Sequence, residues 1–374
     1  VGDLLVTGRR RREEWGGGGS ICRRKRMWRR LSLPLFSLRS MAGTTTTTAV
    51  AASASSLNTD KLNFDKSLSF ESLKRVVGEW NFHEGTKTGD ALSRIPEGTE
   101  VVVTKEMELP AGVVALLPSS VKLICEAGTG YNNIDCEAAK QRGITVCNVP
   151  EYSTDAVASM VMTFVLSLSC SLIQQQRKLW GRGSENREAW ATLQGLRHFE
   201  LAGKTMGLIG GRGAIGSKVG EMARVFGMKV LISSRSDRPC PGAEVVSLDD
   251  LLERSDFVSV HCPLNHETRS SLGTKAFERM KRSAYFINTA RGGIVCEEEL
   301  CEALDSGLIA GAGLDVQVDE PPAESSRLYD LAQKNLILTP HIGWQRRESR
   351  QRLLDSVARN IEGYFRGDPQ NVVN

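Results

Sequence analysis

The sequence predicts an α/β protein built from doubly wound parallel sheets, with helices on both faces of each sheet. Short runs rich in β-branched residues alternate with helical stretches, and this alternation continues for more than 130 residues after Lys204. The chain has 374 residues, which is too long for one ordinary core and suits two domains. A parallel sheet is the arrangement that such an alternation produces.

The first strands and helices lie between residues 60 and 150. Three short runs bounded by Gly or Pro are predicted strands, and they cover residues 100–105, 121–128 and 144–150. The stretch "DCEAAKQRG" between the last two is a predicted helix that ends at Gly143, a natural C-cap.

A long apolar stretch follows at residues 153–173. It begins with "STD", three good N-cap residues, and it approaches membrane-spanning length. Five of the 18 positions from Ala156 to Ile173 are Ser or Thr, and no basic flank precedes the stretch. A buried or dimer-forming helix is the favoured interpretation, and a transmembrane span is the alternative.

The second half of the chain repeats the strand–helix alternation. Predicted strands cover residues 204–210, 228–234, 257–264, 284–290, 308–316 and 335–343. Predicted helices cover residues 217–227, 247–255, 297–307 and 345–366.

Charge is unevenly distributed along the chain, although the formal net charge is only +4. Residues 1–59 hold 11 Lys and Arg against 3 Asp and Glu, and the rest of the chain holds 37 basic and 41 acidic residues. A net acidic body has no general attraction for nucleic acid, so we expect no nucleic-acid partner. Nine scattered cysteines without a C-x-x-C pair argue against a zinc site and a disulfide framework, and favour a reducing compartment.

The basic segment 1–59 is expected to be a disordered or targeting leader. It is rich in Arg, Ser and Thr and has no acidic residue from Trp15 to Thr59, a composition typical of an organellar transit peptide. In that case the protein is chloroplastic or mitochondrial, and otherwise it is cytoplasmic. Because the chain begins with Val1, part of the segment can instead be translation upstream of a start at Met27 or Met41. Nucleic-acid binding by the Arg cluster is a third reading.

A glycine-rich turn, "LIGGRGAIG", follows the predicted strand at 204–210 and opens a predicted helix. Glycines let the backbone approach a pyrophosphate, and the helix offers free N–H groups and its positive end to the anion. In this context a G-x-G-x-x-G pattern predicts a dinucleotide site, with a purely structural turn as the alternative. The residues expected to contact the cofactor are Gly211, Gly213, Ala214, Ile215 and Gly216.

The acid that usually completes this fingerprint is missing. An Asp or Glu at the end of the next strand normally binds the ribose 2′-hydroxyl, but that strand ends in "VLISSR", with Ser234 and Arg235 at this place. Serine and arginine suit a 2′-phosphate. We therefore expect NADP(H) to be preferred over NAD(H). The alternatives are an ordinary exposed strand end, or Asp237 turned inward toward the ribose.

Three further residues follow predicted strands and carry groups suited to catalysis. Arg291, Glu320 and His341 stand at or beyond strand ends, where ligand sites of such sheets lie. Together they can bind a carboxylate, orient an imidazole and move a proton. The structural alternatives are a surface ion-pair partner, a solvated loop charge and a satisfied buried histidine.

Over residues 60–374 the chain resembles the D-isomer-specific 2-hydroxyacid dehydrogenases. Seven motifs in order carry this resemblance: "AGTGYNNID", "NVPEYSTDAVA", "LAGKTMGLIG", "VHCPLNHET", "NTARGGIV", "GLDVQVDEP" and "TPHIG". The stretch "TDAVA", Trp344 and the closing "PQNVVN" look most like the glycerate dehydrogenase or hydroxypyruvate reductase branch.

The resemblance implies two Rossmann-like lobes, with the cofactor lobe inserted into the substrate lobe. Residues 60–149 with 341–374 would form the substrate-binding lobe and residues 150–340 the dinucleotide-binding lobe. It also implies a homodimer, no membrane, and a small 2-oxo or 2-hydroxy acid as substrate, reduced or oxidised by hydride transfer. The apolar helix 156–173 matches the segment that these enzymes use for dimerisation, which favours the interpretation without a membrane.

The resemblance also assigns site residues. Arg291 would bind the carboxylate and carbonyl of the substrate, and His341 would protonate the carbonyl oxygen. Glu320 would pair with His341, because a neighbouring carboxylate favours the imidazolium form. The other expected substrate contacts are Thr129, Gly130 and Trp344, and loops at 104–106 and 129–132 would select the substrate side chain. The other expected cofactor contacts are Pro263, Thr268, Thr289, Ala290 and Asp315, and no metal is expected.

Three features depart from the family pattern. The turn has one residue more before Gly216 than most members, Cys296 stands where many carry Asp, and Ser234 replaces the usual acid. The extra residue either bulges the turn harmlessly or shifts its grip on the pyrophosphate. Formate dehydrogenase shares the fold but has Gln where this chain has Glu320, which argues against that activity. A dinucleotide-sensing corepressor of the same fold remains the alternative function.

Overall fold

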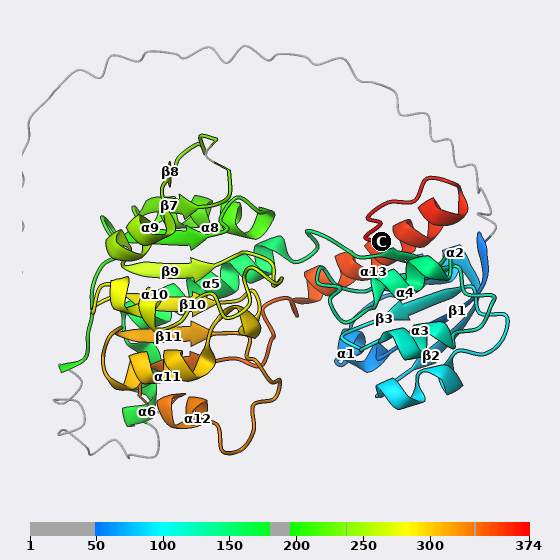
Figure 1. The fold of residues 1–374 in the computed structure, drawn as a ribbon, viewed down its shortest axis with the longest axis horizontal. Helices are drawn as coiled ribbons and strands as arrows, with labels where there is room; N and C mark the ends of the chain where they lie inside the picture. The colour runs from blue at the N-terminus through cyan, green and yellow to red at the C-terminus, as the bar shows by residue number, and fades with distance from the viewer. Residues whose placement is uncertain (1–48, 180–194, 237, 333) are drawn as a thin grey trace, which may run out of the picture. The chain divides into compact units, whose positions relative to one another are not determined.

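The structure is a computed structural model that describes residues 49–179, 195–236, 238–332 and 334–374. It contains a five-stranded and a seven-stranded sheet, and all neighbouring strands in both sheets are parallel (Figure 1). Apolar clusters pack helices on both faces of each sheet. The doubly wound α/β fold predicted from the sequence is confirmed.

The five-stranded sheet has the order β2-β1-β3-β4-β5. Its strands are β1 (Ala51–Leu57), β2 (Val77–His83), β3 (Val101–Thr104), β4 (Leu123–Glu126) and β5 (Thr145–Cys147). The helices α2 (Glu71–Val76) and α13 (Arg347–Phe365) share one buried apolar cluster with the strands. The helices α3 (Ala111–Ala115) and α4 (Cys136–Gln141) share a second cluster with them. The short α1 (Thr59–Asn63) follows β1.

The end of the chain covers the free edge of β5. Val373 N donates to Val146 O at 2.9 Å, and Asn148 N donates to Asn371 O at 3.1 Å. Asn374 Oδ1 accepts from Val146 N at 2.9 Å. Because an open strand edge exposes unpaired backbone groups, these bonds protect the sheet and join the C-terminal segment to the strands of residues 51–147.

The predicted leader 1–59 is wrong at its C-terminal end, because β1 lies inside it. β1 pairs with β2 on one side and with β3 on the other, and Ala54, Ser55, Ser56 and Leu57 are buried. The run "AASASSL" has few large apolar side chains, so composition alone made it look like leader. The transit-peptide and start-site predictions concern residues 1–48, which lie outside the described part of the chain.

The seven-stranded sheet has the order β12-β11-β10-β9-β6-β7-β8. Its strands are β6 (Thr205–Ile209), β7 (Lys229–Ser233), β8 (Glu244–Val245), β9 (Phe257–Val260), β10 (Tyr285–Asn288), β11 (Gly311–Leu314) and β12 (Leu336–Leu338). The chain runs outward from β6 to β8 and then returns to β9 beside β6. The strand order therefore reverses between β6 and β9, and ligands of such sheets bind at the carboxyl ends of the strands at this point.

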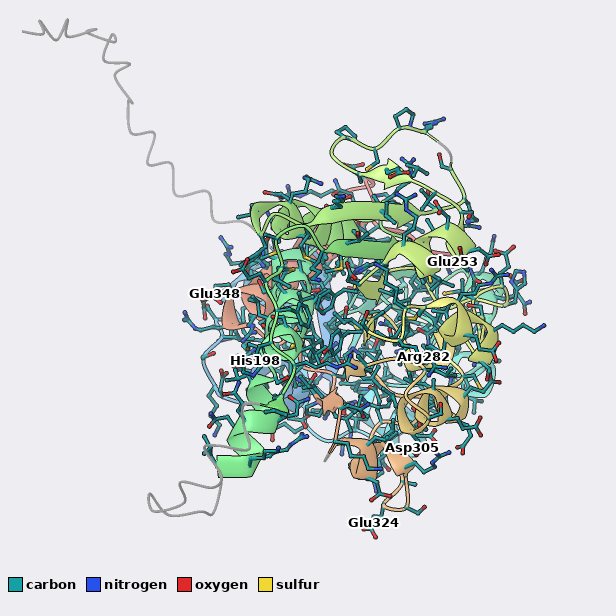
Figure 2. All side chains as sticks on the ribbon, turned by 90° about the vertical axis from the view of Figure 1, so that its left-hand side faces the viewer. His198, Glu253, Arg282, Asp305, Glu324 and Glu348 are labelled. Atoms are coloured by element: carbon teal, nitrogen blue, oxygen red, sulfur yellow. The ribbon has the colours of Figure 1, made fainter. Side chains whose placement is uncertain are left out.

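Helices cover the two faces of this sheet. One buried cluster packs α5 (Thr154–Ser169) and α8 (Ala214–Val225), and the other packs α9 (Leu248–Arg254), α10 (Thr274–Arg279), α11 (Glu297–Asp305) and α12 (Arg327–Ala332). Two acidic residues on these helices, Glu253 and Asp305, are labelled in Figure 2. Glu253 pairs with Arg279 at 3.1 Å, and Asp305 pairs with Arg327 at 2.9 Å.

The apolar stretch 153–173 forms α5 and the start of α6 (Leu172–Leu179), which are bent by 62° at the break between them. Eleven of the 16 residues of α5 are buried. Within the described residues, no single helix is long and apolar enough to cross a membrane, although the bent pair passes the same test of length and composition.

Candidate active site

The residues singled out in the second half of the sequence follow the carboxyl ends of six strands of one sheet. The glycine turn follows β6, Ser234 follows β7, Pro263 follows β9, and Arg291 follows β10, with Glu320 and His341 beyond β11 and β12. Since all these strands are parallel, their carboxyl ends lie along the same edge of the sheet. The sheet therefore gathers side chains that are up to 130 residues apart.

His341 and Glu320 form a close pair. His341 Nδ1 and Glu320 Oε2 are 2.7 Å apart, and Gln317 N donates to Glu320 Oε1 at 3.0 Å. Burial alone would raise the pKa of Glu320, but the bond with His341 holds that pKa below its ordinary value. An ionised carboxylate only accepts hydrogen bonds, so Nδ1 carries the proton in this pair and Nε2 is the nitrogen left for a ligand.

Asp315 holds the loop that carries His341. Its carboxylate accepts from Thr339 Oγ1 at 2.6 Å, Ile342 N at 3.0 Å and Gly343 N at 2.8 Å. His341 N donates to Asp315 O at 2.8 Å, and His341 itself has a left-handed φ of 52°. These bonds fix a backbone conformation that a residue with a Cβ seldom adopts. A role for Asp315 at the nicotinamide stays a prediction, and bracing His341 is a role that sequence reasoning missed.

Arg291 lies against Gly130, which follows β4 of the five-stranded sheet. Arg291 Nη1 donates to Ala290 O at 2.7 Å, and a Cβ added to Gly130 would collide with the Arg291 guanidinium. Among the described residues, the backbone N–H groups of Thr129 and Gly130 have no acceptor, while Thr129 Oγ1 donates to Val149 O at 3.0 Å. A guanidinium and two free N–H groups in contact make a suitable site for a carboxylate.

Trp344 lies over Lys105, which is buried. Lys105 Nζ is 3.9 Å from the centre of the Trp344 ring and 2.7 Å from Glu106 Oε1, and Trp344 Nε1 has no partner among the described residues. Burial alone would lower the pKa of Lys105, but the acidic groups around it, Tyr152, Glu106 and Glu126, raise that pKa above its ordinary value. Lys105 is therefore a charged neighbour of the predicted substrate contact Trp344, in the predicted selectivity loop 104–106.

The remaining predicted cofactor contacts lie in the loops after β9 and β10. Thr268 Oγ1 donates to Pro263 O at 2.6 Å, so these two residues close one loop. Ala290 N donates to Asn288 Oδ1 at 3.0 Å, and Thr289 Oγ1 is buried without a partner among the described residues. The structure brings these loops to the same edge as the glycine turn.

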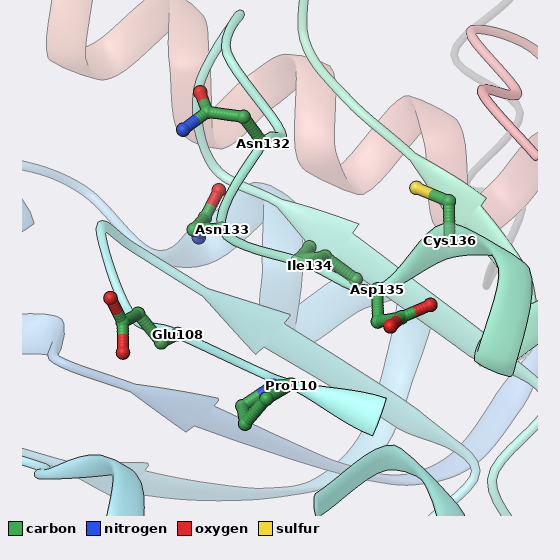
Figure 3. A pocket seen from close by; sticks show the side chains of 7 residues that line it. All are labelled: Glu108, Pro110, Asn132, Asn133, Ile134, Asp135 and Cys136. Carbon is green, nitrogen blue, oxygen red and sulfur yellow. The ribbon is translucent and has the colours of Figure 1, made fainter. Parts of the chain in front are cut away.

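A pocket of about 570 Å³ lies elsewhere, in the five-stranded unit (Figure 3). It is lined by Glu108, Pro110, Asn132, Asn133, Ile134, Asp135 and Cys136. None of the predicted catalytic residues lines it. The lining residue Asn133 donates from Nδ2 to Glu126 Oε2 at 3.0 Å, so its amide already has a hydrogen-bond partner in the protein.

The glycine turn combines tight packing with one open position. A Cβ at Gly211 would lie 2.6 Å from Leu208 Cβ, and a Cβ at Gly216 would lie 2.6 Å from Gly211 Cα. A Cβ at Gly213 would meet nothing within 4 Å, although Gly213 is the N-cap of α8. Packing therefore requires glycine at positions 211 and 216, whereas only an approaching ligand would require it at position 213. A dinucleotide pyrophosphate fits this arrangement.

Comparison with known proteins agrees with this geometry. Residues 162–343 match the sequence model of the D-isomer specific 2-hydroxyacid dehydrogenase NAD binding domain. The glycerate dehydrogenase of Methylorubrum extorquens is 36% identical over 309 residues, which are 81% of this chain and 96% of that protein. The chain belongs to the D-isomer-specific 2-hydroxyacid dehydrogenase family.

Two further comparisons cover nearly the whole of each relative. The hydroxypyruvate reductase of Blautia hydrogenotrophica is 36% identical over 306 residues, which are 80% of this chain and 93% of that protein. The crystal structure of the TT0316 protein from Thermus thermophilus matches with a TM-score of 0.73 and 32% identity, covering 86% of this chain and 100% of that one. This dehydrogenase therefore transfers hydride between a nicotinamide dinucleotide and a small 2-oxo or 2-hydroxy acid.

The open position in the turn gives a prediction with a built-in control. Gly213→Ala should lower the free energy of unfolding by only about 0.5–1 kcal/mol, since alanine is a poorer N-cap than glycine, but should raise the Kd for the dinucleotide at least about tenfold, because its methyl group would push the pyrophosphate off the N–H groups. Gly216→Ala should instead lower the free energy of unfolding by about 1–3 kcal/mol, because its methyl group meets the Gly211 backbone. Calorimetry and a fluorescence titration measure both quantities. An unchanged Kd in Gly213→Ala would contradict the assignment of this turn.

Proposed function

We propose that this dehydrogenase reduces hydroxypyruvate and glyoxylate to D-glycerate and glycolate, with NADPH preferred over NADH. The observation that carries the catalytic part is the pair of His341 Nδ1 and Glu320 Oε2 at 2.7 Å, at the carboxyl edge of the parallel sheet. The names of the relatives support the substrate class, since one is a glycerate dehydrogenase and another is a hydroxypyruvate reductase.

Three groups handle the substrate in this proposal. The Arg291 guanidinium binds the carboxylate and the carbonyl oxygen of the 2-oxo acid, and the N–H groups of Thr129 and Gly130 hold the other face of the carboxylate. His341 Nε2 donates a proton to the carbonyl oxygen, and Glu320 keeps the imidazolium oriented and stabilised. NAD(P)H, when bound, supplies the hydride. Trp344 and its neighbour Lys105 close the side of the site that receives the rest of the substrate.

The preference for NADPH rests on the end of β7. Ser234 stands where an acid would bind the ribose hydroxyls, and Arg235 follows it with its side chain 87% exposed. Among the described residues, Arg235 pairs with Glu267, whose Oε2 lies 3.6 Å from Nη1. An exposed ion pair of this kind contributes little and yields readily to a phosphate.

A homodimer is part of the same proposal. The junction of α5 and α6 exposes two large apolar side chains, Leu166 and Leu172, at 40% and 44%. Burial of such side chains against a second copy would stabilise a dimer. We also propose the predicted lobe boundaries at residues 149–150 and 340–341. The strands of the seven-stranded sheet lie between these boundaries, and the strands of the five-stranded sheet lie before the first one.

A panel of 2-oxo acids assayed with both cofactors tests the function. We expect the highest kcat/KM for hydroxypyruvate or glyoxylate with NADPH. A clear preference for NADH would overturn the cofactor proposal and favour Asp237, which lies outside the described residues, as the ribose ligand. Tight cofactor binding with no oxidation of NADPH or NADH by hydroxypyruvate, glyoxylate or pyruvate would favour the dinucleotide-sensing corepressor instead.

A further inference from the structure

A second arginine reaches the end of β7 from the glycine turn. Arg212 Nε donates to Ser234 Oγ at 2.8 Å, and Ser234 Oγ donates in turn to Ser236 O at 2.8 Å. The Arg212 guanidinium therefore lies beside the residue that replaces the usual ribose-binding acid. The sequence did not single out Arg212, because the G-x-G-x-x-G pattern leaves the residue between its first two glycines unspecified.

The extra residue of the turn explains how Arg212 comes to this place. Gly210 has a left-handed φ of 74°, and a Cβ there would lie 2.7 Å from Cys262 N. Gly211 is packed against Leu208 in the same way. Both adjacent glycines are thus required by packing, and Arg212 is the first residue of the turn that carries a side chain. The added residue lengthens the turn without loosening it.

The charges around Arg212 leave it available to an anion. Arg212 Nη2 is buried and has no hydrogen-bond partner among the described residues. Arg235 follows Ser234 in the sequence, and its Nη1 lies 3.6 Å from Glu267 Oε2. Two arginines and a serine hydroxyl therefore belong to this strand end, and a planar guanidinium binds a phosphate monoester with two parallel N–H donors.

We propose that Arg212 is a specificity-determining residue that binds the 2′-phosphate of NADPH together with Ser234 and Arg235. This proposal rests on the proposed preference for NADPH and names the residue that supplies most of it. Because Nε is already bonded to Ser234 Oγ, the guanidinium is oriented before the ligand arrives, and Nη2 is a donor without a protein partner among the described residues.

Nucleotide binding by the full-length enzyme tests the proposal without relying on turnover. The probes are NADP+, which carries the 2′-phosphate, and NAD+, which differs from it only in lacking this group. Arg212→Gln should weaken NADP+ binding about 10- to 100-fold, the cost of losing hydrogen bonds to a charged group, and should leave the affinity for NAD+ as in the wild type. Arg212→Lys should recover only part of the loss, since an ammonium cannot form the fork. Arg279→Gln, on the outer face of α10, is the matched control and should alter neither Kd.

The outcomes separate this proposal from the one on which it rests. Equal weakening of both nucleotides by Arg212→Gln would mean that Arg212 contacts the pyrophosphate and would overturn its role in specificity. No change in either nucleotide would overturn it as well, while leaving the NADPH preference to Ser234 and Arg235. If the wild-type enzyme binds NADP+ no better than NAD+, the NADPH preference itself fails.

Discussion

Replacing His341 by Gln is expected to lower kcat about 10²- to 10⁴-fold, the usual contribution of a positioned general acid. Glutamine retains a donor of similar length but cannot release a proton. The dinucleotide Kd should stay close to that of the wild type, because the glycine turn lies after β6 and His341 lies after β12. The measurement is kcat with hydroxypyruvate and NADPH beside a fluorescence titration of the cofactor.

His198→Gln is the matched control for this change. His198 is exposed, and its ring Nε2 is 3.5 Å from the side chain of Gln175 (Figure 2). It precedes the amino end of β6, whereas the site residues follow the carboxyl ends of the strands. The same chemical substitution there should leave kcat unchanged. A His341→Gln enzyme with kcat near that of the wild type would show that another group protonates the carbonyl oxygen.

Six of the seven strands of the second sheet were predictable because each is marked in the sequence, whereas the two-residue β8 and the short helices α10 and α12 were not predicted. Strands such as β9 and β10 are short β-branched or aromatic runs, and helices such as α11 end just before a glycine. The same features fix which residues follow strand ends, so Arg291, Glu320 and His341 could be named together. Parallel strands then bring them to one edge without any further information.

The first strand escaped prediction because its burial comes from its neighbours. β1 has a small-residue sequence, and only its position between β2 and β3 makes those residues interior. Patterns of hydrophobicity detect large apolar side chains, whereas a central strand of Ala and Ser is stabilised by its ladder bonds and by what packs on it.

Side-chain direction was the other limit. The sequence shows that the turn has an extra residue, but whether Arg212 points to solvent, to the pyrophosphate or to Ser234 depends on the backbone at Gly210 and Gly211. The bracing of His341 by Asp315 is hidden for the same reason, since it joins residues on two adjacent strands through backbone groups.

Replacing Arg291 by Lys is expected to lower kcat/KM about 100-fold, with most of the change in KM. In the structure the guanidinium is held by the bond from Nη1 to Ala290 O at 2.7 Å and lies against Gly130. A lysine keeps the charge but loses one of two parallel hydrogen bonds to the carboxylate and the bond that orients the group, and each bond to a charged partner contributes about 1.5–3 kcal/mol. Steady-state kinetics with the preferred 2-oxo acid measures the effect.

Gly130→Ala tests the same contact from the other side. The added methyl group would displace the Arg291 guanidinium without changing its charge or its donors, so KM should rise while the dinucleotide Kd stays constant. Its effect should be smaller than that of Arg291→Lys, because a flexible arginine can move away from a methyl group. If Arg291→Lys left KM unchanged while Gly130→Ala raised it, the carboxylate would be held by the backbone at residues 129–130, and the guanidinium would act on the carbonyl oxygen alone.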